Sequence, residues 1–382
     1  MAVGTVFGVG GTSVISRAMG EGKTDYAKRV SSFCMWGCVI AGMIMSAGML
    51  IFINPILSLA GASADTWELA KTYLVIVVFC GPFVLISNCY SNVIRTEGES
   101  AKAMMGTLIG NLLNVVLDPI FILGFGWNIA GAAIATVIGN VVGAGYYIMY
   151  FIRGKSSLSI RLKDFTVKDK VAASVLAIGI PAALGSLLMS ISSIVTNSQM
   201  AQYGDMALAG IGVAMKVTMM TGMVCIGLGQ GIQPILGYCV GAKLWARFKK
   251  VLRFSLVFSF VLSVVLTGIC YLFAGQIVKA FLADATAYGF ALGFSRILLT
   301  TSVFFGVFYV LLNALQAMGA GAAALIINIS RQGVIYIPVM FLLKMIVGMT
   351  GLVWAQPVAD ITSLALAYVL YMQASKKMFR TV

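Results

Sequence analysis

The stretch GQGIQPILGYCVGAKLWARFKKVLRF, residues 229–254, repeats a stretch near the start of the chain, GVGGTSVISRAMGEGKTDYAKRVSSF, residues 8–33. The two align without a gap at an offset of 221 residues, which places Gly241 opposite Gly20. The same offset continues through the pairs Asn92 and Asn313, Arg95 and Gln316, Gly98 and Gly319, and Ala101 and Ala322. Because self-similarity at a fixed offset marks a repeated structural unit, we predict that the two halves of the chain share one fold.

The composition is that of a membrane protein. Of the 382 residues, 60% are hydrophobic and 10% are charged, whereas soluble domains are about 45–50% apolar and 25% charged. Apolar stretches such as 252–273 reach the roughly 20 residues that a helix needs to cross a bilayer. We therefore predict an all-α polytopic membrane protein.

Hydropathy and the repeat together divide the chain into two homologous helical lobes. We predict an N-terminal lobe of five helices over 1–152, a cytoplasmic linker over 153–169 and a C-terminal lobe of six helices over 170–382. Because both repeats would insert with the same orientation, they form a parallel repeat, related by an axis along the membrane normal. The eleven predicted spans are 1–18, 28–57, 66–94, 101–123, 129–152, 170–200, 206–238, 249–273, 286–317, 322–346 and 352–373.

The basic residues behind the net charge of +14 are concentrated in alternate connections between the predicted spans. The first connection carries Lys23, Lys28 and Arg29, whereas the second, NPILSLAGASAD, carries no basic residue. This alternation continues along the chain and, by the positive-inside rule, places the basic connections and the C-terminus in the cytoplasm. We therefore predict a multi-pass protein of the cell (plasma) membrane with no nucleic-acid partner.

The repeat offset also bears on the N-terminus. The predicted helix over 170–200 has no counterpart, because subtracting 221 from 170 gives a position about fifty residues before Met1. We expect the full-length protein to contain one further helix there. An inactive N-terminally truncated fragment is therefore one alternative for the chain as written.

Several motifs spread over nearly the whole chain carry a resemblance to a known family. They are GTSVISRAMGEGK, NVIRTEGESAKAM, NLLNVVLDPIFI, GAAIATVIGN, GQGIQPILGYCVGAK and YIPVMFLL followed by GLVWAQPVAD. The chain resembles the MATE family, the multidrug and toxic compound extrusion transporters, and its second half is most similar to the MepA-like bacterial branch. It departs from the family in lacking the family's first helix.

The resemblance implies two six-helix lobes around a central cleft and a secondary active exporter of drugs or metabolites. Export would be driven by H⁺ or Na⁺ antiport, with alternating access between the lobes. The expected partners are small amphipathic substrates and the lipid bilayer, and the expected state is a monomer. A lipid-linked saccharide flippase of the same superfamily is the alternative function.

Asp118 is the main candidate for ion coupling, because an ionisable residue inside a membrane is expensive and usually functional. Asn114 lies on the same helix face and Asn111 lies one turn earlier. Pro119 frees a backbone carbonyl that could join an ion site. From the residues alone, a structural Asp–Pro turn is an equal alternative. The family resemblance implies that Asn114 and Asp118 belong to a cation site, to which we add Thr136.

Polar residues within other spans are candidates for the cleft. We expect Lys216 to face the cleft and to pair with Asp360, and we consider that Arg296 and Arg331 could be paired structural residues. Gln230 and Gln233 lie beside Pro234, which breaks the helical ladder. The full set of predicted cleft or substrate residues is Asn88, Asn92, Lys216, Gln230, Gln233, Asn313, Arg331 and Asp360.

The remaining composition argues against an enzyme. The chain has no histidine, which excludes His-dependent triads, HExxH zinc sites and His-ligated haem. Its seven cysteines are scattered without a CxxC motif. We therefore predict no catalytic residue, no metal site and no cofactor apart from H⁺ or Na⁺ as the coupling ion.

Overall fold

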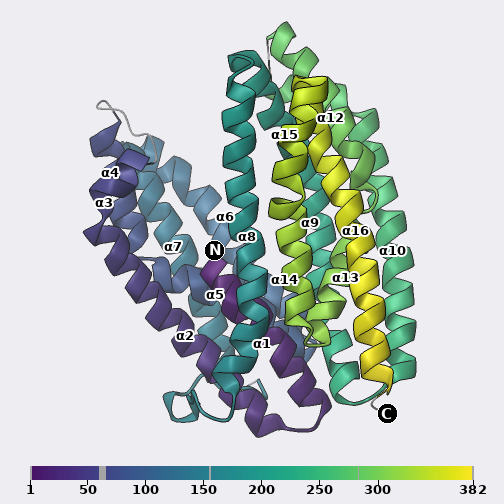
Figure 1. The fold of residues 1–382 in the computed structure, drawn as a ribbon. Helices are drawn as coiled ribbons and strands as arrows, with labels where there is room; N and C mark the ends of the chain where they lie inside the picture. The colour runs from purple at the N-terminus through teal and green to yellow at the C-terminus, as the bar shows by residue number, and fades with distance from the viewer. Residues whose placement is uncertain (1, 60–65, 155, 283, 381–382) are drawn as a thin grey trace. The chain divides into compact units, whose positions relative to one another are not determined.

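A computed structural model describes residues 2–59, 66–154, 156–282 and 284–380 of the chain (Figure 1). Within these ranges the regular elements are all helices, which confirms the predicted all-α fold class. The chain divides into two compact units, which we call lobe 1 (Met1–Gly179) and lobe 2 (Ile180–Val382). The division falls inside helix α8, Val171–Ala201, so this helix begins in one lobe and ends in the other.

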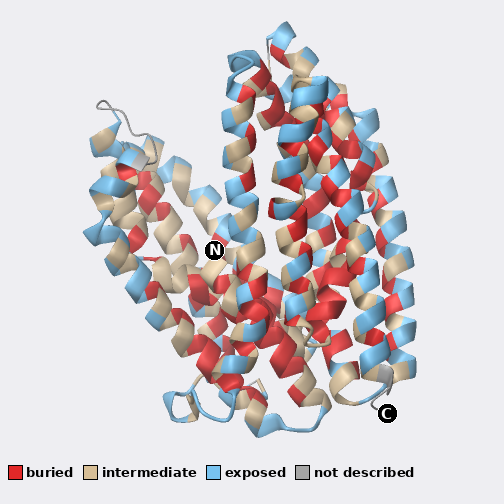
Figure 2. Cartoon of the chain, viewed as in Figure 1, coloured by how far each residue is buried: buried red, intermediate tan, exposed pale blue. Residues whose placement is uncertain are grey.

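Lobe 1 contains seven α-helices, the start of α8 and three short helical segments. They are α1 (Ala2–Gly20), α2 (Thr24–Ile51), α3 (Ile53–Leu59), α4 (Trp67–Val78), α5 (Gly81–Val93), η1 (Ile94–Glu97), α6 (Ser100–Pro119), the π-helical η2 (Ile120–Gly124), α7 (Asn128–Ile152) and η3 (Leu162–Asp164). Its buried residues gather where α1, α2 and α5 pack together, and α6 is largely uncovered (Figure 2).

Lobe 2 contains the rest of α8, eight further α-helices and one π-helical segment. They are α9 (Asp205–Gly241), α10 (Trp245–Leu272), α11 (Ala274–Phe281), α12 (Ala285–Ser302), α13 (Phe305–Ala317), α14 (Gly321–Ile329), the π-helical η4 (Ser330–Val334), α15 (Tyr336–Val347) and α16 (Met349–Arg380).

The helix bounds confirm the repeat. Helix α2 spans Thr24–Ile51 and α10 spans Trp245–Leu272, so both ends differ by 221 residues. The starts of α6 and α14, and of α7 and α16, differ by the same number. Gly98 and Gly319, which end equivalent helices, both take a left-handed backbone, with φ of 80° and 79°. The two lobes therefore build the same succession of helices from equivalent residues.

The repeat extends to individual contacts. In lobe 1, a Cβ added at Gly8 would lie 3.2 Å from Nδ2 of Asn92, and in lobe 2 one at Gly229 would lie 2.6 Å from Nδ2 of Asn313. Each asparagine donates from Nδ2 to the carbonyl four residues earlier, at 2.9 Å and 2.8 Å. A methyl group would collide with the asparagine at Gly229 and would lie unusually close to it at Gly8, so glycine favours this helix crossing in both lobes.

Three predicted spans are divided in the structure. The predicted spans 66–94 and 286–317 are bent, by 56° between α4 and the helix that follows it, and by 48° between α12 and α13. Pro82, in the first turn of α5, explains the first bend because it cannot donate to the preceding turn. The predicted span 28–57 ends earlier, at Ile51, and the separate short helix α3 follows it.

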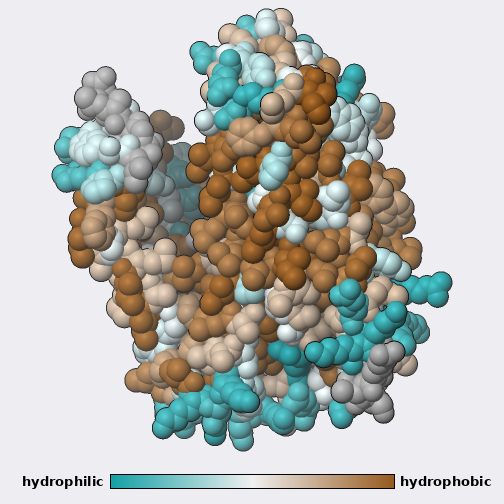
Figure 3. Space-filling view, viewed as in Figure 1, coloured by the Kyte–Doolittle hydropathy of each residue, from teal (hydrophilic) through white to brown (hydrophobic). Residues whose placement is uncertain are grey.

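The helices are long and apolar enough to cross a membrane. Eight described helices meet this condition, or ten if each bent pair counts as one span. In lobe 2, apolar side chains cover the middle of the visible face and hydrophilic side chains gather at its two ends (Figure 3). This distribution suits a bilayer, which exposes the middle of a protein to hydrocarbon. The chain is a multi-pass membrane protein.

Two glycines hold α6 and α7 together in lobe 1. A Cβ added at Gly110 would lie 2.6 Å from the carbonyl oxygen of Gly139, and one at Gly139 would lie 2.6 Å from that of Gly110. We expect Gly139→Ala to lower the free energy of unfolding by about 1–3 kcal/mol, because the added methyl group forces the helices apart. Thermal unfolding of the purified protein in detergent measures this effect.

Gly145 on the same helix is the matched control, because no atom lies within 4 Å of a Cβ added there. Gly145→Ala should leave stability unchanged or raise it by up to about 1 kcal/mol, since alanine is the better helix former. Equal losses in the two variants would show that the close approach of α6 and α7 does not limit stability.

Candidate functional site

The structure brings together three of the residues predicted for ion coupling. Asp118 lies in the last turn of α6, and Nδ2 of Asn114 donates to its Oδ1 at 3.4 Å. The same nitrogen lies 3.4 Å from Oγ1 of Thr136, which is on α7. Asn114 and Asp118 are four residues apart and so share a helix face. We call Asn114, Asp118 and Thr136 the Asp118 group.

Asn140 supports this group and was missed by the sequence analysis. Its Nδ2 donates at 2.8 Å to the carbonyl of Thr136, while Oγ1 of Thr136 donates at 2.9 Å to the carbonyl of Ala132. These bonds fix the hydroxyl that faces α6. The four-residue spacing between Thr136 and Asn140 was the available signal, since it puts both on one face of a helix.

Pro119 shapes the backbone beside the group. A proline has no N–H, so the carbonyl of Val115 cannot receive the usual hydrogen bond from residue 119. The chain then continues as a π-helical turn over Ile120–Gly124, a form that often marks functional positions within helices. The carboxylate of Asp118 and the hydroxyl of Thr136 therefore lie in a stretch where one backbone carbonyl lacks its usual helical donor. Carboxylate, hydroxyl and carbonyl oxygens are the groups that can bind Na⁺ or a proton.

The other predicted residues of lobe 1 lie apart from Asp118. Asn111 is exposed on α6, one turn before the group. Asn88 and Asn92 lie on α5, where they pack against Gly4 and Gly8 of α1. No hydrogen bond joins these three asparagines to Asp118 in the described part of the chain. The assignment of Asn111 to the cation site, and of Asn88 and Asn92 to the cleft, stays a prediction.

Lobe 2 contains a buried ion pair. Nε of Arg331, in the π-helical η4, donates at 2.8 Å to Oδ1 of Asp360 on α16, and the two side chains are only 9% and 6% exposed. Asp360 also accepts from Oγ1 of Thr301 at 3.2 Å and from Nε2 of Gln356 at 2.9 Å. Nη1 of Arg331 lies 3.1 Å from the hydroxyl of Tyr309. Both charges are thus neutralised and hydrogen-bonded, as burial in a membrane requires.

Aromatic rings enclose the guanidinium of Arg331. The ring centroids of Phe305, Phe308 and Tyr309, all on α13, lie 5.0, 4.6 and 5.5 Å from its Cζ. Such distances are favourable for cation–π attraction, which strengthens away from water. Four helical elements of lobe 2 therefore meet at this pair: α12, α13, η4 and α16.

The expected pairing of Lys216 with Asp360 is wrong, because Arg331 occupies that carboxylate. Lys216 is exposed on α9, with its Nζ 5.5 Å from the ring centroid of Phe281 on α11. Arg296 is also exposed and lies 5.7 Å from the ring centroid of Tyr271. Of the three cations considered in these spans, only Arg331 is paired with an acid in the described structure.

The repeat shows what stands at the ion pair's position in lobe 1. Subtracting 221 from Arg331 and Asp360 gives Gly110 and Gly139, the two glycines whose backbones touch between α6 and α7. The same crossing is therefore made by a backbone contact in one lobe and by a buried ion pair in the other. The charged group of lobe 1, Asp118, lies eight residues further along α6.

The remaining predicted cleft residues of lobe 2 lie on α9 and α13. Gln230 and Gln233 flank the turn before Pro234, and Gln233 is buried. Asn313 is buried at the crossing with Gly229. Contact with substrate stays a prediction for all three.

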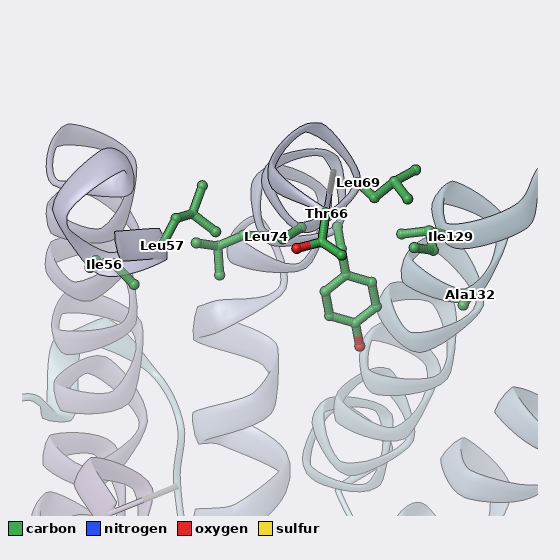
Figure 4. Close-up of a pocket in the computed structure, with 9 residues that line it drawn as sticks. Ile56, Leu57, Thr66, Leu69, Leu74, Ile129 and Ala132 are labelled. Atoms are coloured by element: carbon green, nitrogen blue, oxygen red, sulfur yellow. The ribbon is translucent and has the colours of Figure 1, made fainter. Parts of the chain in front are cut away.

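A groove of about 490 Å³ lies between α3, α4 and α7 of lobe 1. Figure 4 shows Leu69 and Thr66 on one side of this groove and Ile129 and Ala132 of α7 on the other. Among the described residues, its lining is almost wholly apolar.

Among the described residues, no three His, Cys, Asp or Glu side chains lie close enough together to hold a metal ion. The seven cysteines are all buried and free.

Comparisons with known proteins give the family context. A family model described as MatE matches residues 1–120 and 181–342. The multidrug export protein MepA of Staphylococcus saprophyticus is 31% identical over 373 residues, covering 97% of this chain and 82% of the relative. The protein of the same description from Staphylococcus aureus matches with the same identity and coverage.

Solved structures show the same fold. A crystal structure of MATE in complex with MaL6 has a TM-score of 0.94 at 23% identity, covering 99% of this chain and 86% of that one. The Vibrio cholerae MATE transporter VcmN in the bent form has a TM-score of 0.89, also at 23% identity, with the same coverage.

Proposed function

Because the chain belongs to the MatE family, we propose that it is a secondary active exporter of small amphipathic molecules. Export is driven by H⁺ or Na⁺ antiport, and access to the substrate alternates between the two sides of the membrane as the lobes move. The protein acts in the plasma membrane with its C-terminus in the cytoplasm. Multidrug export by the relatives named above supports this substrate class.

The proposed coupling mechanism rests on the Asp118 group. Asp118 is half-buried in a helix that spans the membrane, and no Lys or Arg nitrogen of the described chain lies within 4.0 Å of it. Removal from water disfavours an unpaired carboxylate. A proton on the carboxyl group, or Na⁺ held with Asn114 and Thr136, would compensate its charge.

The ion pair in lobe 2 supports assigning coupling to lobe 1. Asp360 already accepts three hydrogen bonds, from Arg331, Thr301 and Gln356, and Arg331 is its counterion. It has no need of an external cation. Asp118 is therefore the carboxylate whose charge must be balanced from solution.

Antiport follows if ion and substrate favour different states of the protein. A ligand shifts a conformational equilibrium only by the difference between its affinities for the two states. An ion that binds the Asp118 group from outside and leaves toward the inside would reset the transporter after each substrate is released. The ion gradient then supplies the energy for export.

Transport in liposomes tests the proposal. The purified protein is reconstituted with a lipophilic cationic dye, and either a pH gradient or a Na⁺ gradient is imposed across the membrane. We expect one of the gradients to drive dye movement against its concentration difference, and protein-free liposomes to show none. Dye that moves equally well with no gradient, or that is bound but not moved under either gradient, would refute ion-coupled export.

A further inference from the structure

The repeat allows equivalent surfaces of α2 and α10 to be compared. Both helices begin with a basic segment and continue into the membrane. The offset of 221 places Lys250 opposite Arg29, Arg253 opposite Ser32, Phe254 opposite Phe33 and Val257 opposite Trp36. We call Lys250, Arg253, Phe254 and Val257, together with Lys249, the α10 face.

In lobe 1 the equivalent face of α2 is covered by the segment that follows α7. Oγ of Ser32 donates to the carbonyl of Arg161 at 2.7 Å, and Nε1 of Trp36 donates to that of Ile160 at 3.2 Å. The ring of Phe165 stacks on Phe33, with centroids 6.1 Å apart.

That segment also brings a negative charge to the face. Nη1 of Arg29 lies 2.7 Å from Oδ2 of Asp169. The covering of α2 therefore has two parts, an apolar ring over the aromatic residues and a carboxylate beside the cation.

In lobe 2 the α10 face lies open. Phe254 and Val257 are 68% and 59% exposed, whereas Phe33 is 8% exposed. The five residues of the face line a groove of about 520 Å³. Phe254 stacks on Phe258 one turn further along, with centroids 5.9 Å apart, so the apolar surface continues along the helix.

Two cations of the α10 face, Lys250 and Arg253, have no acidic partner among the described residues. Residues 180–382 contain only three acidic side chains, Asp205, Asp284 and Asp360. Asp205 begins α9, and Asp284 follows α11, so both lie at the opposite ends of α9 and α10 from this face. Asp360 is engaged by Arg331. Among the described residues, no carboxylate forms an ion pair with Lys250 or Arg253.

The depth of the face matches a lipid headgroup. Helix α10 has 28 residues, so at about 1.5 Å per residue it is about 42 Å long, which exceeds the roughly 30 Å of the hydrocarbon core. Its first turns, with the three cations, therefore lie at headgroup level. Phe254, Val257 and Phe258 follow at the depth of the acyl chains.

We propose that the α10 face is a binding site for an anionic phospholipid. The phosphate lies against Lys250 and Arg253, with Lys249 beside them, and one acyl chain runs along Phe254, Val257 and Phe258. The lipid supplies to lobe 2 the two things that the segment after α7 supplies to lobe 1, a negative charge and an apolar cover. Arginine and lysine near a membrane surface attract anionic lipids in this way.

Native mass spectrometry of the purified protein, titrated with phosphatidylglycerol or with zwitterionic phosphatidylethanolamine, tests this site. The wild type should retain phosphatidylglycerol in preference to phosphatidylethanolamine. The variant Lys250→Gln/Arg253→Gln should bind phosphatidylglycerol about thirtyfold more weakly, from the usual contribution of two basic residues at a membrane surface. Phe254→Ala should weaken binding as well, whereas a soluble glycerol phosphate should not compete.

A matched control separates the site from overall charge. Lys376→Gln/Lys377→Gln removes the same charge from the C-terminal part of α16 and should leave retention as in the wild type. All variants are first checked for a single folded species by size exclusion. Equal loss in the control pair, or equal retention of the two lipids by the wild type, would overturn the proposal. So would a Lys250→Gln/Arg253→Gln variant that keeps phosphatidylglycerol but loses self-association, since the face would then bind a second copy. None of these readouts depends on transport.

Discussion

Asp118→Asn is expected to reduce gradient-driven dye export to the level of protein-free liposomes while leaving dye binding intact. Asparagine keeps the shape of the side chain and can still accept from Nδ2 of Asn114, which lies 3.4 Å from Oδ1 of Asp118. It carries no charge, so it has no need to take up and release a proton or Na⁺. Dye binding by fluorescence anisotropy and export under an imposed gradient, measured on the same preparation, separate the two properties.

Two control variants sharpen this test. Asp118→Glu keeps the charge and should retain part of the export rate, because only the position of the carboxylate changes. Leu112→Ala changes an exposed side chain on the same helix that lies outside the Asp118 group, so it should export as the wild type does. Normal export by Asp118→Asn under a pH or Na⁺ gradient would make Asp118 structural and place coupling elsewhere.

Arg331→Met should lower the free energy of unfolding by about 3–5 kcal/mol, because it leaves the carboxylate of Asp360 buried without a counterion. Asp360 is 7% exposed and retains only Thr301 and Gln356 as partners in this variant. Asp360→Leu should be similarly damaging, since it strands the guanidinium among three aromatic rings. Thermal unfolding in detergent gives the two values.

The double variant Arg331→Met/Asp360→Leu should recover most of the lost stability, because replacing both buried charges with apolar groups of similar size is often neutral. The coupling between the two sites is then large and favourable in a double-mutant cycle. Losses that simply add would show that the two charges act independently.

The fold was largely predictable because repeat and hydropathy agree. A gapless offset of 221 residues located equivalent helices, and the bounds of α2 and α10 follow it at both ends. The bends were not predicted. The first has a signal in Pro82, whereas the second, around Val303 and Phe304, has no proline, and its nearest glycine is Gly306 in the first turn of α13. Hydropathy alone does not distinguish such a bent pair of helices from one straight span.

The candidate sites were only partly predictable from the sequence. Asn114 and Asp118 share a helix face at a spacing of four, and the structure joins them by a hydrogen bond. The partner of Asp360 was mistaken, because the sequence does not decide which of the cations on other helices reaches this carboxylate. Arg331 lies in a π-helical turn, whose extra residue shifts side chains away from the positions that an α-helical periodicity gives.

The ion pair also limits how lobe 2 can change through single substitutions. Lobe 1 has glycine at both equivalent positions, Gly110 and Gly139, and neither carries a charge. If a glycine pair changes into Arg331 and Asp360 by one substitution at a time, or the reverse, the intermediate protein has one of the two charges buried and unpaired. Each residue is thus deleterious without the other, which makes positions 331 and 360 epistatic. A substitution at one position should be tolerated only when the other has already changed. The substitutions that are accepted at these equivalent positions should therefore differ between the two lobes.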